Sequence, residues 1–199
     1  MRPDLGIVAD MVPHGSRVLD LGCGDGALLE ELIRSRGCSG QGVEVSAEAF
    51  NACVSRGIPV VSADIDEGLP DFSDGSFDVV VLSQTLQTTH HPALVLREMM
   101  RVAGVGIVSF PNFGHVGLRG KLLALGRMPS SRLLPNTWYD TPNIHLCTLL
   151  DFEELVRAEH LSVAGRVLLN RSGMLAPGWI GLRPNVLAAG AAYRLVRPG

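Results

Sequence analysis

The stretch Val18-Leu19-Asp20-Leu21-Gly22-Cys23-Gly24-Asp25-Gly26 decides the fold of this chain. Its first four residues have the composition of a short buried strand, and three glycines follow at alternate positions. The next segment, residues 27–34, carries apolar side chains at helical spacing. Strand, glycine turn and helix in this order are typical of an open α/β sheet, which binds ligands at the carboxyl ends of its strands. Glycine lets the backbone bend sharply there and lets a ligand approach the main chain.

Two ligand classes use such a turn. Residues 22–27 fit the dinucleotide fingerprint G-x-G-x-x-A, which keeps an NAD-dependent oxidoreductase as an alternative. Asp20, however, lies two residues before the first glycine, where its carboxylate would repel a pyrophosphate. S-adenosylmethionine (SAM) carries an ammonium and a sulfonium beside its own carboxylate, and both cations suit a neighbouring acid. The turn therefore favours SAM over a dinucleotide.

An acidic residue follows the second predicted strand. Residues 42–45 form that strand, which places Glu44 at its end, 20 positions beyond Gly24. A carboxylate at this spacing after the glycine turn accepts hydrogen bonds from the ribose hydroxyls of an adenosyl ligand. We expect Glu44 to hold the ribose.

The third predicted strand, residues 59–64, runs into another loop at the same edge of the sheet. We expect Asp64 to accept a hydrogen bond from the adenine amino group and Ile65 to pack on the ring. Asp66 and Glu67 are close enough in sequence to compete for the role of Asp64. Loop acids are also commonly just solvated, so this assignment rests on position alone.

The remaining pattern predicts an α/β sheet with helices on both faces. Residues 77–82 are the strongest strand, and residues 104–110 form a fifth strand after a helix. Residues 161–169 and 191–197 follow as candidate antiparallel edge strands. Together these give a Rossmann-like sheet of about seven strands, mostly parallel, as expected when β and α segments alternate. We expect a single domain over residues 1–199.

Residues 111–147 form a long irregular connection within this domain. They hold four prolines and one predicted helix, at residues 115–125. Long connections in compact domains are usually functional or mobile. The segment leaves the carboxyl end of the fifth strand, so we expect a lid over the pocket or a partner-binding surface.

Composition narrows the function classes. The chain has 199 residues and a formal net charge of -3, with no block of like charge, so no electrostatic footprint for nucleic acid is present. The longest apolar runs are too short to span a bilayer, and no secretory leader is evident. The four cysteines show no C-x-x-C or zinc-ligand spacing. We expect a cytoplasmic protein with free thiols and no partner membrane, nucleic acid or metal.

The run from Val18 to Gly26 resembles motif I of class I SAM-dependent methyltransferases. Most of the chain is also similar to the methionine biosynthesis protein MetW family. The segments that carry the second resemblance are Val18–Gly26, Leu82–Gln87, Ser109–Phe113 and Thr141–Thr148. It implies the class I methyltransferase fold, SAM or S-adenosylhomocysteine as ligand, and association with homoserine O-acyltransferase.

The resemblance also implies a set of cofactor-binding residues, with Ser83 and Gln84 facing the transferred methyl group. The expected set is Asp20, Gly22, Cys23, Gly24, Glu44, Val45, Asp64, Ile65, Ser83 and Gln84.

Two functions remain open at this stage. The first is a SAM-binding protein of methionine biosynthesis that acts with homoserine O-acyltransferase and need not transfer a methyl group. The alternative is a free-standing methyltransferase on an unidentified small molecule. A protonated acceptor would need a base, for which His90, His91 and His145 are candidates by residue type. Gln84 and Thr85 follow the fourth strand in place of an aspartate-proline-proline-tyrosine type motif, which weakens a nucleic-acid methyltransferase reading.

Overall fold

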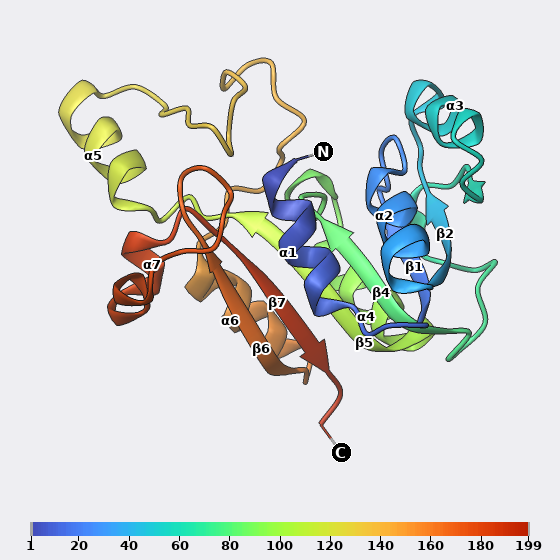
Figure 1. Ribbon diagram of the computed structural model, residues 1–199. Coiled ribbons are helices and arrows are strands. Elements are labelled where there is room, and N and C mark those ends of the chain that lie inside the picture. The colour runs from blue at the N-terminus through green and yellow to red at the C-terminus, as the bar shows by residue number, and fades with distance from the viewer. Residues whose placement is uncertain (1, 199) are drawn as a thin grey trace.

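The computed structural model describes residues 2–198 and shows a seven-stranded sheet in the order β3-β2-β1-β4-β5-β7-β6 (Figure 1). The strands are β1 (Arg17–Leu21), β2 (Ser39–Val43), β3 (Val60–Val61), β4 (Phe77–Ser83), β5 (Ala103–Pro111), β6 (Ser162–Leu169) and β7 (Gly190–Val196). The helices are α1 (Pro3–Met11), α2 (Ala27–Arg36), α3 (Ala47–Ser55), α4 (Pro92–Val102), α5 (Val116–Leu125), α6 (Leu149–Ala158) and α7 (Pro184–Leu187). The predicted α/β class is confirmed; residues 1 and 199 of the expected domain lie outside the described residues.

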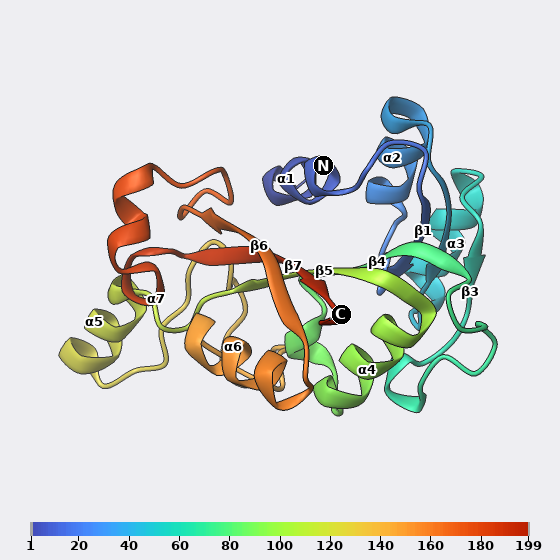
Figure 2. The same ribbon diagram turned by 90° about the horizontal axis from the view of Figure 1, so that it is seen from below.

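Helices cover both faces of the sheet. Figure 2 shows α1 and α2 on one face and α4 and α6 on the other. Each face of the sheet has its own hydrophobic core, and alternate residues of β4 point into one or the other. Val79 and Val81 pack with α1 and α2, whereas Val80 and Leu82 pack with α4 and α6. A parallel strand buried on both faces reads as a continuous apolar run. Among residues 2–198 no helix is both long and apolar enough for a membrane span.

The prediction that residues 191–197 form an edge strand is wrong. β7 lies between β5 and β6 and runs antiparallel to both, so only β6 ends the sheet on that side. Burial gives the physical reason, because Ala191, Ala192, Tyr193 and Leu195 are all fully buried, whereas β6 is largely half-exposed. Strand order at this edge depends on contacts between distant segments.

Three local boundaries also differ from the prediction. β2 begins at Ser39 and ends at Val43, so Glu44 is the first residue beyond it. β3 is only two residues long, and its predicted last residues are loop. The region 173–184, expected to be loop, contains the 3₁₀ helix Gly178–Leu182 and the start of α7.

An aromatic cluster joins β5 and β7 to α6. The Phe110 ring centroid lies 4.6 Å from that of Phe152 and 5.8 Å from that of Tyr193. The Tyr193 hydroxyl donates to Glu153 Oε1 at 2.8 Å, and Arg166 pairs with the same oxygen at 2.7 Å. These contacts fasten α6 against β5, β6 and β7.

The buried Asn112 side chain ties the end of β5 to the approach to β7. Its Nδ2 donates to the carbonyl oxygens of Asn185 and Ala188 at 3.0 and 2.7 Å, and its Oδ1 accepts from the Gly114 N–H at 2.9 Å. Asn112 is fully buried, so each of these groups depends on the amide for a partner.

We predict that Asn112→Ala lowers the free energy of unfolding by about 3 kcal/mol, because two carbonyls and one N–H would be left buried without a partner. Urea unfolding of the purified chain measures the change. The control Asn51→Ala removes an exposed amide from α3 and should change stability by less than about 0.5 kcal/mol. Equal stability of the two variants would contradict the role given to Asn112.

Candidate functional site

A cavity of about 830 Å³ lies at the carboxyl ends of β1, β2 and β4, where the sequence predicts the ligand crevice. Every residue of the predicted cofactor-binding set lines it. Those residues are Asp20, Gly22, Cys23, Gly24, Glu44, Val45, Asp64, Ile65, Ser83 and Gln84. The fold thus brings together side chains from four separate stretches of sequence, and their role in binding stays a proposal.

The glycine turn between β1 and α2 requires glycine at each of its three positions. Gly22, Gly24 and Gly26 have φ angles of 65°, 59° and 76°, in the left-handed region. A Cβ on Gly22 would also lie 2.6 Å from Thr85 Cγ2, so β4's exit packs directly on the turn. Nothing lies within 4 Å of a Cβ built on Gly24, which leaves open space above the turn.

Asp20 is a buried carboxylate without a hydrogen-bond donor. Its side chain is 2% exposed and lines the cavity, and no described residue donates to it. Burial raises the pKa of Asp20 to about 7, while Arg2 opposes the rise and Glu44 adds to it. A buried carboxylate that lacks a hydrogen-bond donor is complementary to a cationic group on a ligand.

Glu44 bridges the glycine turn and the start of α3. Its Oε2 accepts from the Gly24 N–H at 2.8 Å, and its Oε1 accepts from the Ser46 N–H at 2.9 Å. Ser46 in turn caps α3 through its hydroxyl. Each carboxylate oxygen has a second lone pair, so Glu44 can still accept from two hydroxyls of a ligand.

Two acids of the next loop, Asp64 and Asp66, both line the cavity. Asp66 accepts from the backbone N–H groups of His90 and His91 at 2.9 and 2.8 Å, so each of its oxygens already has one donor from the protein. Asp64 caps the 3₁₀ helix Ile65–Glu67 through one oxygen only, at 2.9 Å from the Asp66 N–H. Asp64 therefore keeps a free oxygen at the cavity.

The exit of β4 is strained and polar. Gln84 has a φ of 59°, which is uncommon for a residue with a Cβ, and its buried Nε2 has no partner among the described residues. Ser83 Oγ lies 3.1 Å from Ser109 Oγ and accepts from Arg2 at 3.2 Å. Such strained, unsatisfied positions cluster at functional sites.

Arg2 is one of the cavity-lining residues that sequence reasoning missed. It reaches the cavity from the start of α1, 81 positions away from Ser83 along the chain. A single arginine before a short helix carries no periodic or motif signal.

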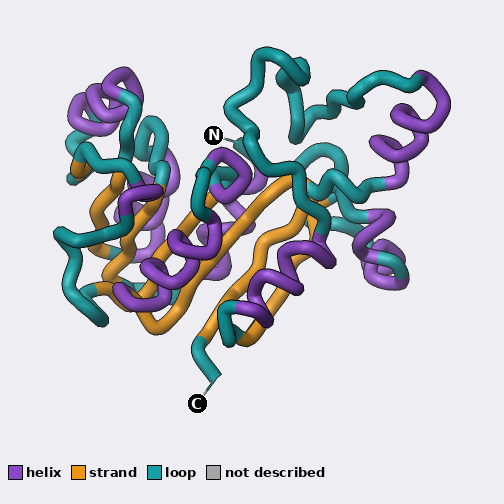
Figure 3. The backbone as a smooth tube through the Cα atoms, turned by 180° about the vertical axis from the view of Figure 1, so that it is seen from behind, coloured by secondary structure: helices purple, strands orange, loops and turns teal. Residues whose placement is uncertain are grey.

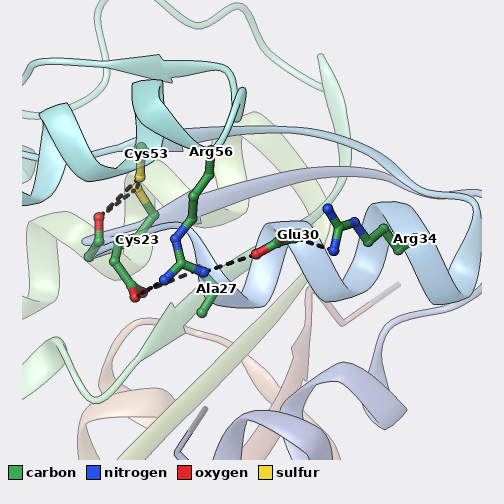
Figure 4. Close-up of polar contacts among 8 residues, drawn as sticks. Cys23, Ala27, Glu30, Arg34, Cys53 and Arg56 are labelled. Carbon is green, nitrogen blue, oxygen red and sulfur yellow. Dashed lines mark hydrogen bonds and ion pairs between the residues drawn. The ribbon is translucent and has the colours of Figure 1, made fainter.

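The cysteines at the turn are thiols packed in the interior. Cys23 Sγ lies 3.7 Å from Cys53 Sγ, and Cys53 Sγ donates to the Gly24 carbonyl at 3.1 Å (Figure 4). Burial raises the pKa of the Cys23 thiol, and the charge of Asp20 raises it further. Cys23 is therefore unsuited to act as a nucleophile.

An ion-pair chain holds α2 and α3 together at the cavity rim. Arg56, at the end of α3, pairs with Asp25 at 2.7 Å and with Glu30 at 2.9 Å. Arg34 joins the chain through Glu30 at 2.9 Å, and Figure 4 shows Glu30 between the two arginines. All four side chains line the cavity.

None of the three candidate bases belongs to the described lining of the cavity. His90 and His91 are exposed, and their ring centroids are 6.5 Å apart. His145 is exposed and is held through its backbone N–H to the Gln87 carbonyl at 3.0 Å. The described lining contains no histidine, so the idea that one of them acts as a base gains no support from position. Residues 2–198 also hold no group of His, Cys, Asp and Glu arranged to bind a metal ion.

Residues 111–147 do not contribute to the described lining of the cavity. Figure 3 shows most of the segment as a long loop that follows α5. It returns to the body of the protein where the N–H groups of Ile144 and His145 donate to the Gln87 carbonyl, at 2.8 and 3.0 Å. Gln87 belongs to the 3₁₀ helix Leu86–Thr88, which follows the exit of β4.

The fold is shared with solved methyltransferase structures. One neighbour is the putative methyltransferase in complex with the Trm112 methyltransferase activator of Haloferax volcanii, with a TM-score of 0.71, 17% identity and coverage of 98% of this chain and 88% of that one. Another is a SAM-dependent methyltransferase from Thermotoga maritima, with a TM-score of 0.68, 18% identity and coverage of 98% and 88%.

Two relatives are similar in sequence. The bifunctional methionine biosynthesis protein MetXA/MetW of Rhodopirellula baltica is 38% identical over 158 residues, which are 75% of this chain and 25% of that protein. The ubiquinone biosynthesis O-methyltransferase of Methylococcus capsulatus is 30% identical over 132 residues, or 63% of this chain and 55% of that enzyme. The chain thus spans a quarter of the first relative and about half of the second.

The family described as methionine biosynthesis protein MetW matches residues 2–195, nearly the whole chain. This match agrees with the resemblance of the four sequence segments and with the identity to the bifunctional relative. The chain therefore belongs to the MetW family.

Proposed function

We propose that the chain binds SAM or S-adenosylhomocysteine in the cavity above the glycine turn and acts with homoserine O-acyltransferase in methionine biosynthesis. The observation that carries the binding proposal is the buried, unpartnered carboxylate of Asp20 beside that turn. The ammonium and sulfonium of SAM supply the positive charge that this carboxylate lacks. Structural neighbours described as SAM-dependent methyltransferases support the same ligand.

The amino-acid end of the ligand lies on the turn in this proposal. Asp20 faces the ammonium, while Gly22 and Gly24 leave room for the chain of the ligand because they have no side chain. Cys23 packs beneath the turn rather than reacting. Arg2, which already lies at the cavity, is placed to bind the carboxylate of the ligand.

The adenosine end lies across the next two loops. Glu44 accepts from the ribose hydroxyls, and the exposed Val45 covers the sugar at the rim. The free oxygen of Asp64 accepts from the adenine amino group, and Ile65 packs on the ring. Ser83 and Gln84 line the cavity beyond the sulfonium position.

SAM, when bound, supplies an activated methyl group, which in-line attack by an acceptor removes. Holding the two reactants in register is the main contribution that this chain offers to such a step. Burial raises the pKa of the lining residue Asp20 to about 7, near the value that suits a base. In this proposal, however, Asp20 binds the ligand and does not take a proton from an acceptor. The lining therefore supports ligand binding more directly than proton abstraction, which favours the accessory role.

Residues 111–147 provide the surface for the partner in this proposal. Apolar side chains are exposed along α5 and the loop after it, an unusual number for a surface that remains in water. They are Val116, Leu122, Leu123, Leu125, Met128, Trp138, Tyr139, Ile144 and Leu146. The relative from Rhodopirellula baltica carries MetXA and MetW in its name as one bifunctional protein, which supports a neighbouring acyltransferase.

The alternative function is methyl transfer to a small molecule without a partner. It is favoured by the similarity to ubiquinone biosynthesis O-methyltransferases. In that case a methyl acceptor that needs a base would have to reach His90, His91 or His145, which are not in the described lining of the cavity. We place the protein in the cytoplasm in either case, since its four cysteines are free thiols in the structure.

We predict that Asp20→Ala and Glu44→Ala each weaken SAM binding at least about tenfold, or about 1.4 kcal/mol, because each removes a carboxylate that faces a polar group of the ligand. Calorimetry with SAM, S-adenosylhomocysteine and NAD measures this. Asp71→Ala, which removes an exposed acid outside the cavity lining, is the matched control and should bind as the wild type does. Unchanged affinity in both cavity variants would show that SAM binds elsewhere. Binding of NAD without binding of SAM would reject SAM as the ligand.

We predict that SAM affinity rises about tenfold from pH 6 to pH 8. The ionised form of Asp20 binds the cationic ligand, and its pKa of about 7 means that this form grows from a minority to nearly all of the population over that range. Arg2 and Glu44 are the charged groups that act on the same carboxyl. Asp20→Asn should show weaker binding with a flat profile between pH 6 and 8; a wild-type profile that is equally flat would contradict the assignment.

We predict that the double variant Leu123→Lys, Leu125→Lys loses co-purification with the homoserine O-acyltransferase of the same organism. Both side chains are highly exposed on α5, at 90% and 67%, and a lysine there keeps helix propensity but opposes an apolar interface. Val54→Lys on α3, where valine is 55% exposed, is the matched control and should co-purify normally.

The acyl-transfer rate with and without the chain completes this test. Under the accessory proposal the wild type and the α3 variant change the rate, and the α5 variant does not. If the wild type neither forms a complex nor alters the rate, the free-standing methyltransferase is the better account.

A further inference from the structure

A second cavity, of about 480 Å³, lies between the start of α5 and two loops. Its walls come from residues 115–121, 130–133 and 171–172, and from Ala189 just before β7. It shares no described lining residue with the first cavity. Figures 1 and 2 both place α5 at the opposite end of the molecule from α3, so the two cavities belong to different parts of the structure.

The charges around this second cavity are all positive. Lys121, Arg132 and Arg171 line it, whereas its described lining contains no aspartate or glutamate. Lys121 donates to the Ser130 carbonyl at 3.0 Å, but within residues 2–198 none of the three cations forms an ion pair. The cavity therefore carries a positive potential that the described protein does not neutralise.

One of these cations lies against the positive end of a helix. A Cβ on Gly117, in the first turn of α5, would come within 2.8 Å of Arg171 Nη2, so the guanidinium lies close to the helix N-terminus. Helix N-termini carry a partial positive charge and repel cations. This placement is unfavourable unless an anion lies near both groups.

His115 adds a hydrogen-bond donor that no described residue uses. Its side chain lines the cavity and the residue is 7% exposed. Nδ1 accepts from the Gly117 N–H at 2.9 Å, so in the neutral ring the hydrogen is on Nε2. No described residue accepts from Nε2. Burial lowers the pKa of His115, and the charge of Arg171 lowers it further, which keeps the ring in this neutral form.

We propose that this cavity binds the oxyanion group, phosphate or carboxylate, of a small metabolite. The guanidinium groups of Arg132 and Arg171, the ammonium group of Lys121 and the Nε2–H of His115 are donors that such a group requires. Leu118, Leu133 and Ala189 provide apolar contacts for the rest of the ligand. The volume is in the range of small-molecule sites. This site is independent of the SAM proposal, since the two cavities have no described residue in common.

Calorimetric titration of the full chain with inorganic phosphate and, separately, with acetate tests the proposal, at constant ionic strength set with sodium chloride. We expect saturable binding of at least one anion to the wild type. Arg171→Gln and Arg132→Gln should each weaken it at least tenfold. Arg127→Gln removes the same charge from an exposed arginine just after α5 that does not line the cavity, and it should stay within twofold of the wild type.

A second measurement does not depend on any variant. The ring signals of His115 in heteronuclear NMR should move on anion addition, while those of the exposed His160 should not. A stronger response to phosphate identifies a phosphate ester as the ligand class, and a stronger response to acetate identifies a carboxylate. Absence of saturable binding, an equal loss in the Arg127 variant, or an unmoved His115 signal would each overturn the proposal. Repeating the titration with saturating S-adenosylhomocysteine separates this site from the first cavity.

Discussion

The attachment of the glycine turn to the end of β2 is the constraint on which the rest of the site depends. The Val43 carbonyl accepts from the N–H groups of both Gly22 and Cys23, at 2.8 and 3.2 Å. The Glu44 carboxylate then accepts from the Gly24 N–H. Because the turn and the acid hold each other, a ligand that contacts Glu44 is brought against the open face of the turn. The left-handed glycines make this possible, since a side chain there would strain the turn or fill its space.

Much of this site was predictable because its signals are local. Asp20, Glu44 and Asp64 each lie within a few residues of a strand end, and parallel strands bring their carboxyl ends to one edge of the sheet. The alternation of predicted strands and helices likewise predicted the class of the fold. The helix predicted after the glycine turn, for example, is α2, which begins at Ala27 as the sequence indicates.

What failed depends on long-range contacts. The position of β7 inside the sheet follows from burial of its residues on both faces, which pairing with β5 and β6 creates. Arg2 reaches Ser83 across 81 residues. The candidate histidines were chosen by residue type, and type alone does not place a side chain in a cavity.

One short element connects the proposed ligand and partner regions. Thr88, in the 3₁₀ helix Leu86–Thr88, lines the first cavity, and Gln87 of the same helix holds the returning end of residues 111–147. The buried Oε1 of Gln87 and Nε2 of Gln84 both lack partners among the described residues. Unsatisfied groups at this point are suited to rearrangement when a ligand or a partner binds.

The most direct test of the central claim is a crystal structure of the chain grown with S-adenosylhomocysteine in excess. The account predicts the ligand in the first cavity, with its amine at Asp20 and its ribose hydroxyls at Glu44. A structure in which that cavity is filled by the protein's own side chains, or in which the ligand lies elsewhere, would contradict it.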